Sequence, residues 1–124
     1  MQFKYPQTNT IALPYVSPDI PKDKVTSQLV RDELLNCFQD ANKEFMLVLN
    51  QPVTDEALKT QVKEFVTTVF NNCGVNFENP TKDGILTAMA QCKANAEKMM
   101  GSNGANIIQH HYDEMMKLVA KLPE

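Results

Sequence analysis

The sequence predicts an all-α protein, most simply an antiparallel four-helix bundle that follows an extended, proline-rich N-terminal arm. After the arm, apolar residues recur at steps of three and four, which is the spacing of one face of an α-helix. All four glycines fall at predicted helix ends or turns, and no proline falls inside a predicted helix. The predicted helices span about residues 24–50, 55–73, 82–100 and 104–122, within one domain of residues 23–124.

The arm comprises residues 1–22 and differs in composition from the rest of the chain. Its four prolines are Pro6, Pro14, Pro18 and Pro21. Each proline removes a backbone donor and favours extended geometry in the preceding residue. Aromatic residues such as Tyr5 and Tyr15 are uncommon in disordered tails. We therefore expect part of the arm to pack on the folded body or on a partner.

The first predicted helix has a long apolar face and is capped by Asp23 or Thr26 at its start. Pro52 should stop it near Asn50. Residues on the expected buried face are Val30, Leu34, Cys37, Phe38, Ala41, Phe45 and Val48, with Leu49 at the border.

The three later helices have comparable signals. Thr54 and Thr81 are expected N-caps, and Gly74 is expected to take the left-handed conformation that ends the second helix. Residues 101–104, Gly-Ser-Asn-Gly, form the turn between the last two helices. Narrow apolar seams are expected at Ile85, Met89, Cys92, Ala96 and Met99, and then at Ile108, Tyr112, Met115, Val119 and Leu122.

Composition excludes some classes of function. The net charge of −3 and the scattering of 12 basic residues among 15 acidic ones disfavour a nucleic-acid binder, which usually carries a basic stripe. No run approaches the roughly 20 apolar residues that a spanning helix needs, so no membrane span is expected. Three widely spaced cysteines and no signal peptide favour a cytoplasmic protein with reduced thiols.

The sharpest polar motif is the run from His110 to Glu114, His-His-Tyr-Asp-Glu. Histidines beside carboxylates could hold a metal, but neighbouring residues point about 100° apart around a helix. A surface or core-edge role is therefore preferred for both histidines. The alternative is a metal or small-ligand site near His111, Tyr112, Cys92 and Glu114. No catalytic constellation and no cofactor are predicted.

The back of the first predicted helix is unusually apolar. If Leu34 is at the centre of its buried face, then Leu29, Leu35, Met46 and Leu47 lie on the flank or on the far side. Exposed apolar patches often mark interaction sites. Either the arm, with Tyr5 and Tyr15, or another protein chain should cover them. The leading hypothesis is thus a small helical interaction or assembly protein, a homodimer or a component bound to a protein partner, rather than an enzyme.

Overall fold

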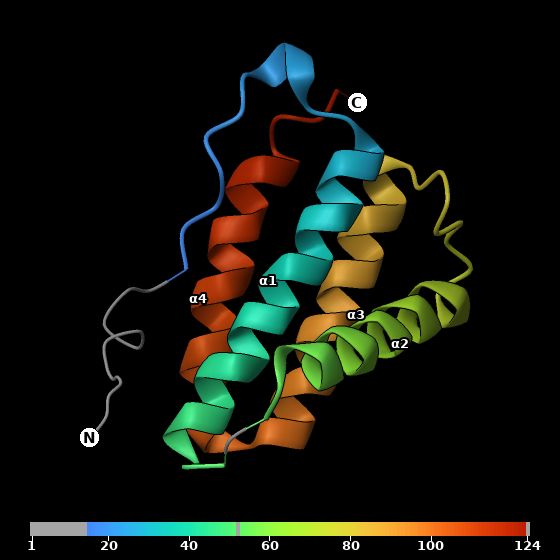
Figure 1. Ribbon diagram of the computed structural model, residues 1–124. Helices are drawn as coiled ribbons and strands as arrows, with labels where there is room; N and C mark the ends of the chain where they lie inside the picture. Colours follow the sequence, from blue (N-terminus) through green and yellow to red (C-terminus); the bar gives the residue numbers. More distant parts are fainter. Residues whose placement is uncertain (1–14, 52, 124) are drawn as a thin grey trace.

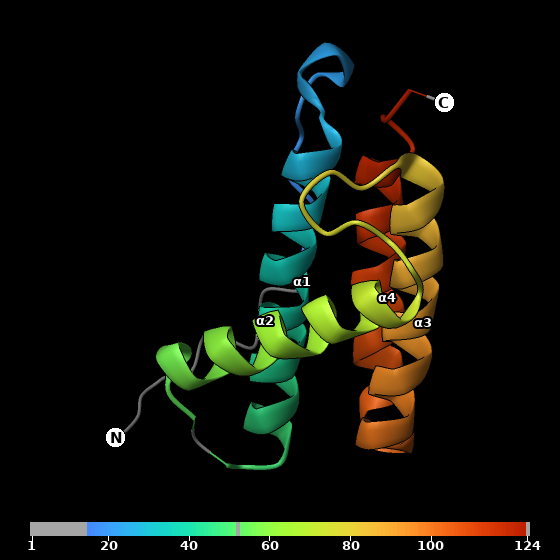
Figure 2. The same ribbon diagram turned by 90° about the vertical axis from the view of Figure 1, so that its right-hand side faces the viewer.

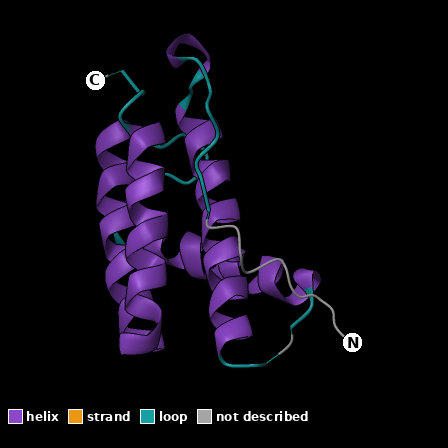
Figure 3. Cartoon of the chain, turned by 90° about the vertical axis from the view of Figure 1, so that its left-hand side faces the viewer, coloured by secondary structure: helices purple, strands orange, loops and turns teal. Residues whose placement is uncertain are grey.

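The computed structural model describes residues 15–51 and 53–123 and contains four α-helices in that part of the chain. They are α1 (Ser27–Val48), α2 (Asp55–Asn72), α3 (Lys82–Met100) and α4 (Ser102–Val119), preceded by a short 3-10 helix at Lys22–Lys24. Figure 3 shows helices and loops and no strand among these residues. The predicted all-α class and its four helices are confirmed.

The helices begin where threonine side chains can cap them. Thr26, Thr54 and Thr81 each accept a hydrogen bond from the backbone N–H three residues later, at 3.0–3.1 Å. This bond satisfies one of the donors that an α-helix leaves unpaired in its first turn. Of the two caps predicted for the first helix, Thr26 is the one used. The helix therefore starts at Ser27 rather than near residue 24.

Two helices end through residues in the left-handed region. Gly74 has φ 72°, as predicted, and Asn50 has φ 57°. In each case the next residue donates back into the last turn: Gln51 N–H to Met46 O and Val75 N–H to Phe70 O, both at 2.9 Å. These are Schellman motifs, which pair otherwise free carbonyl groups. The first helix thus ends at Val48, two residues before the predicted end.

Three helices, α1, α3 and α4, run alongside one another, and α2 crosses two of them. Figures 1 and 2 show α1 and α3 pointing the same way, with α4 returning in the opposite direction, while α2 lies steeply across α1 and α3. Helices that follow each other in the sequence were expected to pack antiparallel. This holds for α3 with α4 but not for α1 with α2. Helical periodicity identifies the buried face of a helix, whereas the crossing angle depends on how the side-chain ridges interlock.

The core fills the space between α4, α1, α3 and the crossing helix. Its largest fully buried side chains come from all four helices and include Leu34, Phe70, Ile85, Met89, Ile108 and Met115. The predicted apolar face of α1 is buried from Val30 to Phe45.

The ends of α1 and α3 depart from the predicted pattern. Val48, predicted to be buried, is 60% exposed because the last turn of α1 extends past the point where α2 crosses it. Met99, predicted on the α3 seam, is 70% exposed, whereas Met100 is buried. The buried positions of α3 therefore continue by a step of four from Ala96 to Met100. A straight helix of 3.6 residues per turn drifts away from the narrower coiled-coil spacing.

α4 begins at Ser102, two residues earlier than predicted, so Gly104 lies in its first turn and not in the expected four-residue turn. A Cβ at this position would lie 2.4 Å from Met100 Cβ and 2.8 Å from Met100 Sδ. We expect Gly104→Ala to lower the free energy of unfolding by about 1–3 kcal/mol, the usual cost of overpacking. Chemical denaturation followed by circular dichroism measures this change. Asn106→Ala, on an exposed position of the same helix, should be neutral or slightly stabilising. Equal stability of both variants would contradict the close packing.

Candidate functional site

The described part of the arm packs on its own chain, along α1 and α4 (Figures 1 and 3). The Tyr15 hydroxyl donates to Glu33 Oε2 of α1 at 2.5 Å, and the Ser17 N–H donates to Glu114 Oε1 of α4 at 3.2 Å. His110 Nε2 donates to the Tyr15 carbonyl at 2.7 Å, and Lys121 Nζ donates to the Ile20 carbonyl at 2.8 Å.

Tyr15 is thus an intramolecular contact. Tyr5, the other aromatic residue proposed for this role, lies outside the described residues.

The arm covers His111, a buried polar side chain on α4. Its side chain is only 3% exposed. The Tyr15 ring stacks on the imidazole with centroids 5.1 Å apart and planes 17° apart. His111 Nδ1 lies 2.7 Å from the Ile107 carbonyl oxygen, and Nε2 lies 2.9 Å from Asp40 Oδ2 of α1. The imidazole therefore stacks on one aromatic ring and has an oxygen atom within hydrogen-bond distance of each of its two nitrogens.

These two oxygen contacts determine the protonation of His111. A carbonyl oxygen can only accept, so Nδ1 carries a proton. Nε2 then faces the Asp40 carboxylate, which can also only accept a hydrogen bond. Unless a cation lies between them, Nε2 therefore carries a second proton. Burial, the largest single influence, lowers the pKa of His111. The hydrogen bonds to Asp40 and Ile107, with the negative charges of Asp40 and Glu44, outweigh it and raise the pKa above its ordinary value.

Asp40, Glu44 and His111 form a cluster that could hold a metal ion. One donor atom from each residue lies within 4.8 Å of the others. Asp40 and Glu44 are one helical turn apart on α1, so both side chains extend from the same face. One imidazole nitrogen and two carboxylate oxygens suit a first-row divalent cation. The Asp40 side chain is 49% exposed, which leaves the cluster open to solvent.

The structure places the other residues of the predicted ligand site in separate contacts. Tyr112 lies under Lys93 of α3, whose Nζ is 5.6 Å from the ring centroid. Glu114 accepts from Lys117 Nζ at 2.6 Å and from the arm. Cys92 is fully buried, and burial, followed by the nearby Cys73, raises its pKa to about 12. His111 alone of the predicted set joins the cluster with Asp40 and Glu44.

Asp40 and Glu44 were missed because their partner is distant in the sequence. Their spacing of four residues on α1 is a visible signal, but this spacing is common on solvated helix faces. Only the packing of α1 against α4 brings His111, 71 residues away from Asp40, to these carboxylates. A single sequence does not specify that register.

A second candidate is an apolar surface at one end of the molecule, here called the apolar end. It consists of Leu47, Val48 and Leu49, which close α1, and Met99 near the end of α3. Their exposed fractions are 41%, 60%, 37% and 70%. Because α1 and α3 point the same way, these residues gather at the same end of the fold (Figures 1 and 2).

The other residues predicted for an interaction surface are less available. Leu29, Leu35 and Met46 are half-buried and pack against the hydrophobic core. Of the predicted apolar back of the first helix, Leu47 alone is an exposed side chain.

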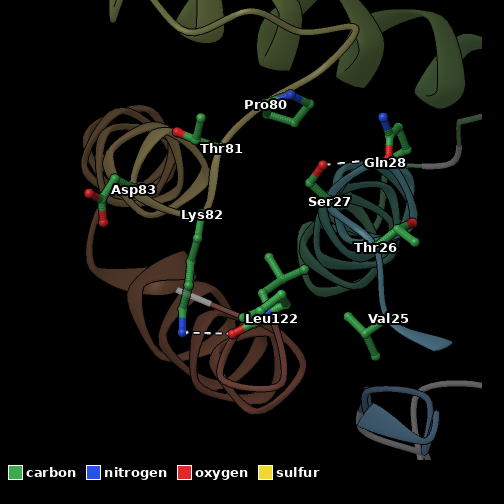
Figure 4. Close-up of a pocket in the computed structure, with 10 residues that line it drawn as sticks. Val25, Thr26, Ser27, Gln28, Pro80, Thr81, Lys82, Asp83 and Leu122 are labelled. Atoms are coloured by element: carbon green, nitrogen blue, oxygen red, sulfur yellow. Dashed lines mark hydrogen bonds between the residues drawn. The ribbon is translucent and has the colours of Figure 1, made fainter. Parts of the chain in front are cut away.

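A pocket of about 590 Å³ lies at the opposite end, between the starts of α1 and α3 (Figure 4). Its wall includes Thr26, Thr81 and Lys82, and Lys82 Nζ donates to the Leu122 carbonyl at 3.0 Å. The two threonines accept hydrogen bonds from their own helices as caps. None of the candidate residues described above lines this pocket.

The carboxylate of Glu114 should control how firmly the arm is docked. The hydrogen bond from Lys117, then that from the Ser17 N–H, lowers the pKa of Glu114, and the His110 charge acts in the same direction. A lowered carboxyl pKa stabilises docking above the ordinary value of about 4.3, and this stabilisation is lost as pH falls through the lowered value. We expect the Ser17 amide proton shift, measured by NMR, to move upfield on acidification through that range.

Two variants test this assignment. Glu114→Gln should move the Ser17 amide shift upfield at neutral pH and abolish its acid transition, because the uncharged amide is a weaker acceptor. The exposed neighbour Asp113, which accepts from Gln109 on its own helix, gives the matched control. Asp113→Asn should leave the Ser17 titration unchanged. A Ser17 transition that survives in Glu114→Gln would assign it to another group.

Comparison with known proteins does not supply a function. No family model, no curated protein and no solved structure matches the chain. In the described part of the chain, no helix is both long and apolar enough to cross a membrane. The choice among functions therefore rests on the geometry of the cluster and of the apolar end.

Proposed function

We propose that this protein is a small helical interaction protein that associates with a second copy of itself through the apolar end. The observation that carries this proposal is the exposure of three consecutive apolar residues, Leu47, Val48 and Leu49, at the end of a helix whose core-facing apolar positions are buried. Met99, near the end of α3, is 70% exposed at the same end of the fold. Isolated exposed apolar residues are ordinary, whereas a contiguous group often marks a contact site.

The free energy gained by burying the apolar end is of the same order as the free-energy cost of association. Full burial of a Val, Leu or Met side chain contributes about 1.5–3 kcal/mol. A two-fold symmetric contact buries each residue of the apolar end twice, once from each copy. These gains must exceed the loss of translational and rotational freedom, about 4–15 kcal/mol. Because the four side chains are only partly exposed, the expected dimer is of moderate affinity.

The cysteines support a binding role over nucleophilic catalysis. A reactive cysteine needs a lowered pKa and access to solvent. Cys37 and Cys92 are buried, and burial is the largest cause of the raised pKa of each. The Cys37 thiol instead donates to the backbone carbonyl of His111 at 3.6 Å. Both thiols therefore fit the role of small core residues.

Sedimentation velocity tests the self-association. We expect the wild-type protein to sediment as a dimer at concentrations well above a dissociation constant on the order of 10 µM, which corresponds to about −7 kcal/mol. Leu47→Glu and Val48→Glu should each shift the protein to monomer, because a charge would be buried without a partner. Helical circular dichroism should be retained, since both residues are exposed.

Val16→Glu is the matched control. Val16 is 70% exposed but lies in the arm rather than at the apolar end. This variant should associate like the wild type. A wild-type protein that remains monomeric at ten times the stated concentration, or a Val48→Glu dimer as stable as the wild type, would rule out the apolar end as the contact.

A further inference from the structure

We propose that Asp40, Glu44 and His111 bind one divalent first-row transition ion of the zinc class, with His111 Nε2 and one oxygen of each carboxylate as ligands. This inference goes beyond the proposed self-association, since the cluster lies between α1 and α4 and includes no residue of the apolar end. The donor atoms already lie within 4.8 Å of one another.

The imidazole is oriented as a metal ligand. Metal-binding histidines usually donate their other ring N–H to a carbonyl or carboxylate oxygen, which fixes the tautomer and the ring orientation. His111 does this through Nδ1 and the Ile107 carbonyl, at 2.7 Å. The stacked Tyr15 ring holds the imidazole plane from the side. Nε2 therefore faces α1, where Asp40 Oδ2 lies 2.9 Å away.

The carboxylates are placed to share an ion with this nitrogen. Zinc binds nitrogen and oxygen at about 2.0–2.2 Å, so adjacent ligands around it lie about 3–3.5 Å apart. Asp40 Oδ2 is already 2.9 Å from Nε2. Glu44 lies one turn further along α1 and is half-buried, and one of its carboxylate oxygens is within 4.8 Å of the other two donor atoms.

A divalent ion would also balance the negative charge of the two carboxylates. The oxygens on both sides of the imidazole are acceptors, and the two carboxylates repel each other when ionised. A divalent ion at Nε2 takes the place of the second ring proton and attracts both carboxylates. Three donors are too few for calcium, which takes six to eight oxygens, but they match zinc sites that keep a position for water.

The approach to this position is open. Asp40 lines a shallow surface hollow with Asn36, Gln39, Lys43 and Asp55. The basic side chain in this lining, Lys43, pairs with Asp55 at 3.3 Å. Water and an ion can therefore reach the Asp40 carboxylate from this side without displacing the arm from α4.

Titration with Co²⁺, followed by its visible absorption, and with Zn²⁺, followed by calorimetry, tests the site on the intact protein. We expect one ion per chain and competition between Zn²⁺ and Co²⁺. Asp40→Asn combined with Glu44→Gln should weaken binding by at least about 100-fold, because even loss of a supporting contact typically costs 10–100-fold. Both residues are solvent-accessible, so this variant should keep its helical circular dichroism. His111→Gln should lose binding to a similar extent.

His110→Gln is the control for adventitious binding by a surface histidine. His110 is adjacent to His111 but directs Nε2 to the Tyr15 carbonyl, so its replacement should leave the affinity within about threefold. Affinity that is unchanged in the double carboxylate variant, or lost in His110→Gln, would overturn the proposed ligand set. A wild-type dissociation constant weaker than about 1 mM, a binding free energy of only about −4 kcal/mol, would overturn the site itself.

Discussion

The packing of α1 against α4 is the constraint on which most of the structure depends. Leu34 and Cys37 on α1, with Ile108 and Met115 on α4, are almost entirely removed from solvent. Residues 15–21 lie along the outer edge of these two helices, held by hydrogen bonds to Glu33 of α1 and Glu114 of α4. The same register places Asp40 beside His111. A shift of one helical turn, about 5.4 Å, would separate Asp40 from His111 and disrupt the packing of Tyr15 on this pair of helices.

The parts of the fold that could be predicted are those with local causes. A threonine before an acidic or apolar stretch caps a helix through its own hydroxyl, and Thr54 and Thr81 do so where expected. Gly74 takes a positive φ because the end of α2 requires it. The buried face of α1 follows from spacing alone as far as Phe45. The crossing of α2 and the exposure of Val48 could not be predicted in this way, since they depend on how long each helix stays in contact with its neighbours.

The residues of the candidate site also divide into those with a local signal in the sequence and those that only the packing of helices brings together. His111 was singled out from its position at the edge of the apolar face of its helix, and the structure buries it. Its partners Asp40 and Glu44 look like ordinary surface acids in the sequence, because solvated helices carry many such pairs. Their significance arises only from a contact across 71 residues of chain. Tyr112 and Cys92, which local sequence proximity or seam position had suggested, make other contacts.

Both proposals draw on the C-terminal half of α1, and the electrostatics of that half favour a cation. The C-terminal end of a helix carries a partial negative charge, which basic side chains in the last turn usually offset. The last turn of α1 contains no basic residue and instead ends in apolar side chains. Asp40 and Glu44 add two carboxylates within the two preceding turns. A proton on His111 offsets one of these charges, whereas a divalent ion at the same nitrogen would offset both. The ion would thereby stabilise the end of the helix that bears Leu47, Val48 and Leu49.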